Sequence, residues 1–387
     1  MNISYNDIKM EGVVANPYAI VIHGYEANQY YTPVIHNNII NQTNARGIDL
    51  DAIDWFLGMK GGLIYNNYID TKQGCLIDNY GGDKHPPSCG THSLRIRGSD
   101  NYYFAGKNLS NSYGENSNNW IYNNTIIMRQ GELLSDGSLS GFGYALRFRV
   151  LDYNQSLNLT FENNTFISIT NSTFDGQPEN DLQAASVYTD GILPGNNIIF
   201  RNNKFVSNFR PLWVAGSDIK FIDNTIERFG VVNSYYTSIM VGYWIFQSTG
   251  NLFLNQSFVN SPGFSSLVYR DTDGGNIKNI TVKWYLDVNV ASGGVPVSGA
   301  SVEVRDLFNS LVFSGTTDAS GFIKTNLIQY TEICNMQGCT PSKTNYTPHS
   351  LYVEKQGYKS ETNSLIINSS KTLNIQLQSS SSEVNAF

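Results

Sequence analysis

The chain has 387 residues, of which 25 are basic and 32 are acidic, so its formal net charge at neutral pH is -7. This mildly acidic balance argues against a general nucleic-acid binder. No apolar run is long enough to span a bilayer, and Met1 opens directly into a repeat rather than into a signal peptide. The length leaves room for one repeat domain and one smaller domain.

A short phrase recurs through the first 260 residues, and in each copy apolar residues alternate around a corner that contains Asn. The copies include VIHNNII (34–40), LIYNNYI (63–69), WIYNNTI (120–126), TFENNTF (160–166), IFRNNKF (199–205) and KFIDNTI (220–226). The period of two predicts short strands with apolar side chains inward. Asn suits the corner because it tolerates left-handed backbone, and stacked Asn side chains would form an amide ladder. The sequence therefore predicts a parallel β-helix.

A second phrase, which precedes each corner, aligns one strand from each of seven coils. The first predicted inward column contains Ile20, Ile48, Leu94, Leu146, Val187, Leu212 and Ile239. The second contains Ile22, Leu50, Ile96, Phe148, Thr189, Val214 and Val241. The outward residues are Val21, Asp49, Arg95, Arg147, Tyr188, Trp213 and Met240, and beside them His23, Asp51, Arg97, Arg149, Asp190, Ala215 and Gly242. Because neighbouring strands lie roughly 4.8 Å apart, we expect the outward residues to form one exposed stripe.

Charged and aromatic residues gather in this stripe, although only 15% of the chain is charged. The candidate substrate-binding residues are Arg95, Arg97, Arg147, Arg149, Tyr188, Asp190 and Trp213. Four neighbouring guanidinium groups repel unless an anion is bound, and their forks suit carboxylates and sulfates. Exposed Tyr and Trp rings would support sugar rings. The stripe thus predicts a groove for an acidic polysaccharide, and the alternative is a solvated salt-bridge ladder with Asp49 and Asp51.

Three residues of the stripe are candidate catalytic groups. The backbones of Asp49 and Asp51 would lie roughly 6.6 Å apart on one strand, which is compatible with the carboxyl gap of an inverting glycosidase. A lyase would instead use His23, or less favourably His92, as base, with the arginines neutralising the charge that develops. Whether the protein is an enzyme stays open between a polysaccharide lyase, a glycoside hydrolase and a non-catalytic binder.

Four cysteines fall in two local pairs, and we expect the disulfides Cys75–Cys89 and Cys334–Cys339. Twelve N-x-S/T sequons, some of which arise from the corner phrase itself, fit a glycosylated protein that is extracellular or at the cell surface. Neither cysteine pair has zinc spacing. The segment DTDGG (271–275) resembles part of a calcium loop but lacks the acidic twelfth position, so no metal or cofactor is expected.

From Ile280 onward the pattern changes to alternating runs separated by turn residues. These runs are TVKWYLDVNV (281–290), ASVEVRD (300–306), SLVFSGT (310–316), GFIKTNLIQY (321–330), SLYVEKQ (350–356) and TLNIQLQ (372–378). They predict a small antiparallel β-sandwich. The stretch VPVSGASVEVRDLFNSLVFSGTTDASGFIKTNL, followed by HSLYVEKQGY, resembles the carboxypeptidase-regulatory-like and immunoglobulin-like modules. That resemblance implies a spacer or adhesion unit of exported proteins.

The corner phrases themselves resemble the right-handed parallel β-helix group that includes pectate lyases, other polysaccharide lyases, alginate epimerases and NosD-like surface proteins. The resemblance implies a shape rather than an activity. The adjacent Asp pair and later Gly-His-Gly that polygalacturonases would show are absent from the sequence.

The expected fold is therefore all-β, a right-handed parallel β-helix over 1–282 followed by a small antiparallel β-sandwich over 283–378 and a Ser-rich tail over 379–387. We expect the β-helix to lack its N-terminal cap, because the repeat begins at once. The expected function is binding, with cleavage left open, of an acidic polysaccharide or glycan. The alternative is a non-catalytic cell-surface, adhesion or stalk protein. We expect no nucleic-acid partner and no membrane span, and the oligomeric state stays open.

Overall fold

The computed structural model describes most of the chain and is all-β. The described residues are 2–12, 18–22, 32–44, 49–55, 60–73, 90–97, 103–104, 107–108, 116–130, 142–149, 157–170, 183–190, 192, 194–230, 236–242, 247–270, 276–335 and 340–380. Over these ranges the only helix is one turn of 3-10 helix, η2 (Gly263–Ser266). The chain forms two compact units. Unit 1 comprises 1–251, 256–278 and 334–340, and unit 2 comprises 252–255, 279–333 and 341–387.

Unit 1 is built from three sheets. Sheet 1 contains, in spatial order, β1 (Asn2–Ser4), β4 (Val34–His36), β7 (Leu63–Tyr65), β12 (Asn116–Tyr122), β15 (Leu157–Glu162), β18 (Asn197–Arg201), β21 (Ile219–Ile222) and β24 (Ser248–Leu254). Sheet 2 contains β2 (Asp7–Gly12), β5 (Ile39–Asn44), β8 (Tyr68–Gln73), β13 (Thr125–Gln130), β16 (Thr165–Thr170), β19 (Lys204–Ser207), β22 (Thr225–Arg228) and β25 (Ser257–Val259). Sheet 3 contains β3 (Tyr18–Ile22), β6 (Asp49–Trp55), β9 (Gly90–Arg97), β14 (Phe142–Arg149), β17 (Gln183–Asp190), β20 (Leu212–Ala215), β23 (Ile239–Val241) and β26 (Val268–Tyr269).

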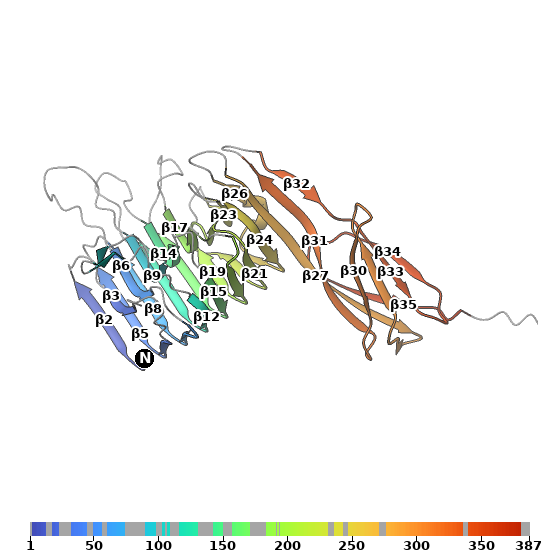
Figure 1. The fold of residues 1–387 in the computed structure, drawn as a ribbon, viewed down its shortest axis with the longest axis horizontal. Coiled ribbons are helices and arrows are strands. Elements are labelled where there is room, and N and C mark those ends of the chain that lie inside the picture. The colour runs from blue at the N-terminus through green and yellow to red at the C-terminus, as the bar shows by residue number, and fades with distance from the viewer. Residues whose placement is uncertain are drawn as a thin grey trace, which may run out of the picture. The chain divides into compact units, whose positions relative to one another are not determined.

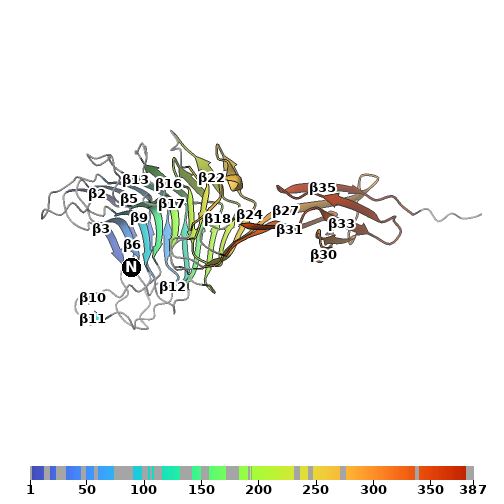
Figure 2. The same ribbon diagram turned by 90° about the horizontal axis from the view of Figure 1, so that it is seen from above.

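The chain visits the three sheets in rotation. Each passage adds one strand to sheet 1, the next to sheet 2 and a third to sheet 3, so that neighbours within a sheet come from successive passages (Figures 1 and 2). Neighbouring strands run parallel throughout sheets 2 and 3. They are also parallel from β1 to β21 in sheet 1. This order is compatible with the predicted β-helix. A separate antiparallel pair joins β10 (Tyr103–Phe104) to β11 (Lys107–Asn108).

The corner between sheets 1 and 2 confirms the predicted role of Asn. The first residue of each corner has left-handed backbone, with φ near +55° at Asn37, Asn66, Asn123, Asn163, Asn202 and Asp223. The second residue points inward and forms an amide ladder. Its side-chain hydrogen bonds join Asn38 to Asn67, Asn67 to Asn124, Asn124 to Asn164, Asn164 to Asn203 and Asn203 to Asn224, at 2.9–3.1 Å. The ladder satisfies buried amides that would otherwise destabilise the interior.

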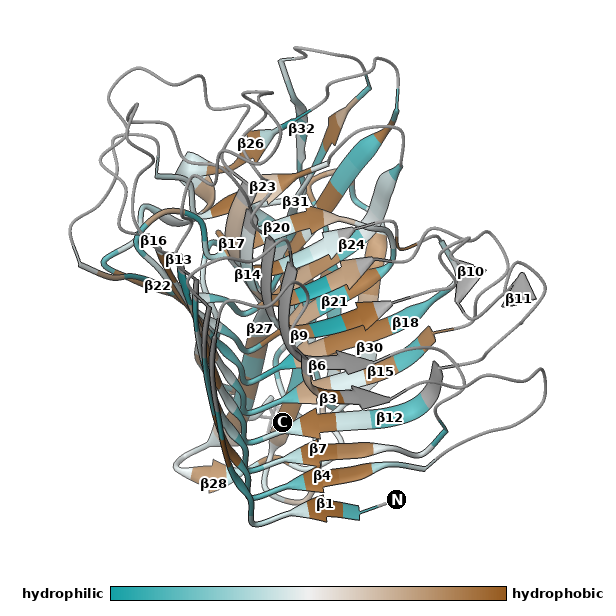
Figure 3. Cartoon of the chain, turned by 90° about the vertical axis from the view of Figure 1, so that its left-hand side faces the viewer, coloured by the Kyte–Doolittle hydropathy of each residue, from teal (hydrophilic) through white to brown (hydrophobic). Residues whose placement is uncertain are grey.

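The interior is filled by apolar side chains that recur at matching positions on successive strands, as the alternation predicts. Figure 3 shows apolar residues, in brown, recurring on successive strands of sheet 1. In that sheet the rings of Phe161 and Phe200 stack at 4.6 Å, and those of Phe200 and Phe221 stack at 5.2 Å. In sheet 3 the predicted inward columns are confirmed from β9 onward. The first runs Leu94–Leu146–Val187–Leu212–Ile239, and the second runs Ile96–Phe148–Thr189–Val214–Val241.

The predicted register of 46–52 is wrong. Ile20 and Leu94 both pair with Ile53, whereas the prediction put Ile48 beside them. Asp54 is the residue opposite Arg95, and Trp55 is opposite Ile96. The cause is a repeated dipeptide: Ile-Asp occurs at 48–49 and again at 53–54, and each copy lies in an alternating run. Alternation alone could not choose between them.

A column of small residues precedes the first inward column of sheet 3. The strand ladders skip one position there, at Ala19, Ala52, Ser93, Ala145 and Ser186. At this position the Ser93 hydroxyl donates to the Ile127 carbonyl of sheet 2 at 2.9 Å. The competing register would place Gly47 there, which is also small, so residue size does not explain which Ile-Asp copy the fold selects.

Unit 2 contains two groups of strands. One group holds β27 (Lys278–Ser292), β28 (Val295–Pro296), β31 (Phe322–Cys334), β32 (Ser342–Asn345) and β35 (Lys371–Gln376). The other is antiparallel, in the order β30 (Leu311–Thr316), β29 (Ser301–Arg305), β33 (His349–Glu354) and β34 (Glu361–Leu365). Apolar side chains of both sheets are buried, among them Val288 and Val304. The six predicted strands are present, but β27 and β35 pair in parallel, so unit 2 is not wholly antiparallel.

Candidate functional site: an arginine–aromatic layer on sheet 3

The structure brings most of the predicted binding residues together on sheet 3. Arg95 pairs with Arg147, then Tyr188, Trp213 and Met240 follow on successive strands. The neighbouring row runs Arg97–Arg149–Asp190–Ala215, again as predicted. The side chains of Arg97, Arg149 and Asp190 lie outside the described part of the structure.

The predicted exposure of the row Arg95–Arg147–Tyr188–Trp213 is wrong. The exposed fraction is 1% for Arg95, 8% for Arg147 and 0% for both Tyr188 and Trp213. These side chains belong to a second packed layer on sheet 3, whose apolar members are Tyr144, Ala185, Tyr188, Trp213, Ala215 and Met240. We call this set, with its arginines, the arginine–aromatic layer. A period of two identifies the face that a residue occupies, but it does not reveal whether that face is covered.

The rings of this layer contact one another, and guanidinium groups lie close to them. The rings of Tyr144 and Tyr188 stack at 4.8 Å, and Tyr188 meets Trp213 at 4.4 Å. The Arg147 guanidinium carbon lies 5.4 Å from the Tyr144 ring centroid and 5.6 Å from that of Tyr188. A cation held over aromatic faces away from water contributes roughly 2 kcal/mol. The Trp213 indole N–H also donates to the Gly242 carbonyl at 3.0 Å, which fixes the ring.

Two arginines of the layer were missed by the sequence analysis. The Arg210 guanidinium lies 4.7 Å from the rings of Phe209 and Trp213, and Arg270 lies 5.4 Å from Trp213. Both are buried, and both have further interactions in the structure. The spacing of Arg210 and Trp213 in the phrase RPLWVAG was an available signal. Arg270 follows β26 and lies outside the aligned phrases, so nothing in the repeat marked it.

Two of the predicted catalytic residues, Asp49 and Asp51, do not pair with the arginines. Asp49 pairs with Gly90 and Asp51 with His92, whereas the prediction placed them next to Arg95 and Arg97. His23 and the segment 271–275 lie outside the described residues. Within the residues that the structure describes, no group of three or more His, Cys, Asp or Glu side chains could hold a metal ion. An arginine stays protonated at neutral pH, so the layer offers fixed positive charge rather than proton transfer.

A different aromatic group lies open on sheet 1. His36, Tyr65 and Tyr122 stack on successive strands, with ring centroids 4.7 and 4.9 Å apart and planes within 2° and 6°. Tyr5 meets His36 edge-on at 5.4 Å, and Trp120 lies 4.5 Å from Tyr122. We call these five residues the aromatic corner. Tyr5 is 77% exposed and Trp120 is 42% exposed, so both offer ring surface to solvent.

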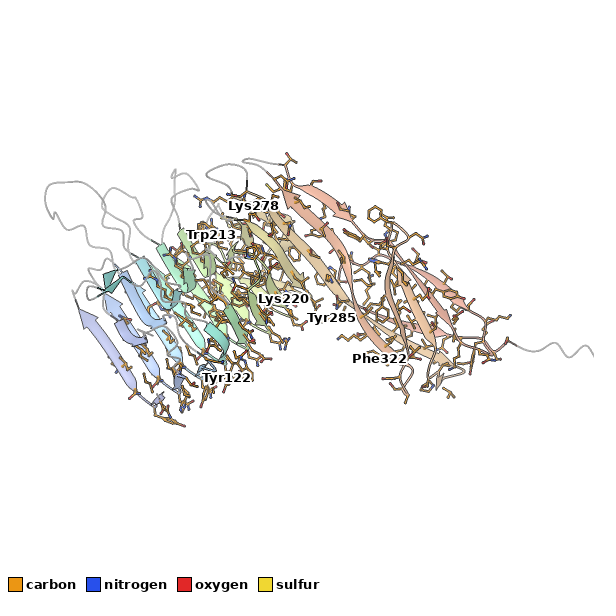
Figure 4. All side chains as sticks on the ribbon, viewed as in Figure 1. Tyr122, Trp213, Lys220, Lys278, Tyr285 and Phe322 are labelled. Atoms are coloured by element: carbon orange, nitrogen blue, oxygen red, sulfur yellow. The ribbon has the colours of Figure 1, made fainter. Side chains whose placement is uncertain are left out.

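The two aromatic groups occupy different parts of unit 1. Figure 4 shows Tyr122 at one edge of the stacked strands, away from Trp213. Partial burial, and then the proximity of Tyr65, raises the pKa of the Tyr122 hydroxyl, so Tyr122 stays neutral under ordinary conditions. The sequence carried a signal for this corner, since His36, Tyr65 and Tyr122 each stand directly before an Asn pair.

The cysteines are only partly described. Cys334 is buried and is not a free thiol. Cys75, Cys89 and Cys339 lie outside the described residues, so both disulfide pairings stay predictions. None of the described helices is long and apolar enough to cross a membrane.

Comparison with known proteins adds little. No protein-family model matches the chain, and no curated protein matches it. Among solved structures, one described as "The Bacillus anthracis TIE protein" aligns with 29% of this chain and 20% of that chain, at 17% identity and a TM-score of 0.19. A likeness of that extent carries no argument about fold or function.

Proposed function

We propose that residues 1–282 form a right-handed parallel β-helix that acts as a rigid, non-catalytic spacer in an extracellular or cell-surface protein. Residues 283–378 form its β-sandwich module. The observation that carries the proposal is the burial of Arg95, Arg147, Tyr188 and Trp213. The residues that would have lined a catalytic groove are packed side chains, and Asp49 and Asp51 do not stand beside the arginines.

The contacts between successive strands support a rigid element. The Asn ladder, the Phe stack and the arginine–aromatic layer each join neighbouring passages of the chain at one repeated position. In such an array each passage is stabilised by the next, so stiffness is distributed along its whole length. Side-chain ladders of this kind leave few rotamers free.

The test is a comparison of Arg147→Ala with Lys72→Ala, which removes an exposed cation from sheet 2. A structural role predicts a loss of about 2 kcal/mol for Arg147→Ala. That loss should lower the Tm of the full chain by about 4–8 °C, since a unit of this size shifts by roughly 2–4 °C per kcal/mol. Lys72→Ala should leave the Tm nearly unchanged. An unchanged Tm for Arg147→Ala, together with weakened binding of a polymer, would overturn the spacer.

Binding of an acidic polysaccharide at the arginine–aromatic layer is the second candidate function. It is favoured by the guanidinium groups of Arg147, Arg210 and Arg270, which gather around one set of rings, whereas the burial of these side chains counts against it. Guanidinium groups pair with carboxylates through two parallel hydrogen bonds. This function predicts that the full chain binds polygalacturonate or alginate and that binding weakens steeply with NaCl. An absorbance assay for unsaturated uronate would show whether binding leads to cleavage.

The proposed location rests on the cysteines and the sequons. Disulfides persist in oxidising compartments, so Cys75–Cys89 and Cys334–Cys339 should both be bridged in the native protein. Mass spectrometry of the unreduced, digested protein should find both linked peptide pairs. Four free thiols in the native protein, isolated from its own host without reductant, would count against the proposed location.

A further inference from the structure

The aromatic corner has the features of a recognition surface that the spacer role leaves unused. Its residues come from three neighbouring strands, β4, β7 and β12, and from the β1–β2 corner. Tyr5 has φ of +59°, the left-handed backbone that Asn takes in the equivalent corners. A bulky side chain at positive φ is unfavourable. Tyr5 nevertheless takes this conformation, and its side chain is largely exposed rather than packed inward.

The corner is rigid before any ligand arrives. The Tyr65 ring is held between His36 and Tyr122, with near-parallel planes on both sides. The Asn37 side-chain amide donates to the His36 Nδ1 at 2.9 Å, which fixes that ring as well. The strands beneath are locked by the Asn ladder, where Asn67 bonds Asn124 at 2.9 Å. Little conformational freedom remains to be lost when a ligand binds.

The polar surroundings of the corner favour an uncharged ligand. Beyond Tyr122 the same row continues with Glu162 and Arg201, one acid and one base. On the same face, Asn158 donates to Asn118 at 2.7 Å and Asn197 donates to Asn158 at 2.9 Å. This outer amide row offers neutral donors and acceptors along the strand stacking direction. Such a surface suits hydroxyl groups rather than carboxylates.

The shape of the exposed surface selects a chain-like ligand. The rings follow one another in single file from strand to strand, one strand spacing apart. A stable protein–protein interface buries about 800 Å² on each partner, with an apolar centre ringed by polar groups. A single file of rings with polar rows beside it is too narrow for that. An extended polysaccharide contacts a surface in single file, and its apolar ring faces pack on Trp and Tyr.

We propose that the aromatic corner binds an uncharged polysaccharide of pyranose units, with Trp120 and Tyr5 as stacking faces and Tyr65 and Tyr122 as the ridge between them. The site is separate from the arginine–aromatic layer, and the inference goes beyond the proposed spacer. The spacer role and polymer binding at the aromatic corner depend on different side chains. Either proposal can therefore fail while the other stands.

The experiment is a binding titration of the full chain with soluble β-glucan, mannan and xylan as neutral probes, and with polygalacturonate and alginate as acidic ones. At least one neutral polymer should bind, with an affinity that hardly changes between low and high NaCl. Trp120→Ala should weaken that binding by roughly tenfold or more, the loss expected for one central aromatic contact. Trp120→Phe should restore part of it.

Phe229→Ala is the matched control, because Phe229 is 48% exposed and lies outside the corner. It should leave polymer affinity unchanged. Thermal unfolding should show that neither Trp120→Ala nor Phe229→Ala disturbs the fold. The inference is overturned if no neutral polymer binds, or if Trp120→Ala binds as well as the unmodified chain. Binding of the acidic polymers alone, lost on Arg147→Ala, would overturn it in favour of the arginine–aromatic layer.

Discussion

The arginine–aromatic layer and the aromatic corner are built in the same way and end in opposite environments. Both place one ring per strand on the outer face of a parallel sheet, at spacings of 4.4–4.9 Å. On sheet 3 the rings are buried, and guanidinium carbons lie 4.7 and 5.6 Å from ring centroids. On sheet 1 the end rings of the stack stay open to solvent. The same stacking of rings can therefore serve packing where the sheet face is buried and recognition where the sheet face is exposed.

The largest expected effect separates the two tryptophans. Trp213→Ala should lower the free energy of unfolding by about 3–5 kcal/mol, because a buried indole, its hydrogen bond to Gly242 and its contacts with two arginines are lost together. Trp120→Ala should change it by less than about 0.5 kcal/mol. Urea denaturation of both variants measures the two losses in free energy of unfolding. Equal losses would break the distinction between a covered face and an open one.

A smaller effect links the ladder to the corner above it. Asn67→Ala removes hydrogen bonds to Asn124, Ile35, Tyr65 and Asn38, and should cost about 2–4 kcal/mol. It should also weaken neutral-polymer binding, because Tyr65 loses its fixed position. Asn66→Gly is the control: its φ of +54° suits Gly, so stability should change little. Polymer affinity that survives Asn67→Ala would show that the corner does not depend on the ladder.

A pH-dependent effect should distinguish unit 2 from both faces of unit 1. Burial lowers the pKa of His349, and the nearby Asp306 opposes this only in part. The unfolded state therefore takes up the proton first as the pH falls through about 6.5, and stability is lost in that direction. The protection factors of the β33 amides, corrected for the intrinsic pH dependence of exchange, should fall between pH 7.5 and 5, and His349→Phe should flatten that slope. An identical slope in the variant would assign the pH response to other groups.

The smallest expected effect is that of salt on the open face. Neutral-polymer binding at the aromatic corner should change by less than about twofold between 0.05 and 0.5 M NaCl, since no net charge is neutralised there. Isothermal titration across that series provides the measurement. A steep salt dependence would place the ligand on guanidinium groups and remove the contrast between the two faces.

Much of unit 1 was accessible from the sequence because its repeat encodes local geometry. The Asn corner requires left-handed backbone and offers a ladder, and both were expected from the residue type alone. The inward columns from Leu94 onward followed from the alternation. The register of β6 did not, because two Ile-Asp pairs compete and alternation alone does not distinguish them.

The candidate sites were less accessible for a different reason. The residues Arg95, Arg147, Tyr188 and Trp213 were correctly placed in one row, but their burial depends on what covers sheet 3. Arg210 and Arg270 join them through folding rather than through the repeat. The aromatic corner was not identified from the sequence, since alternation assigns a face without measuring its exposure. A repeat cannot encode which face of a sheet will be covered by other parts of the chain.

The Asn ladder also gives unit 1 a direction. From Asn6 to Asn203, each side-chain amide donates one hydrogen bond to the oxygen of the next corner along the sequence, and each side-chain oxygen faces the previous corner. From Asn38 onward the same amide nitrogen also donates to a backbone carbonyl of the preceding passage. The amide dipoles therefore add head to tail, with the negative end toward β1 and the positive end toward β21. Aligned amides polarise one another, so each bond strengthens its neighbours. A single break would divide one long dipole into two short ones, and its effect would be felt several corners away.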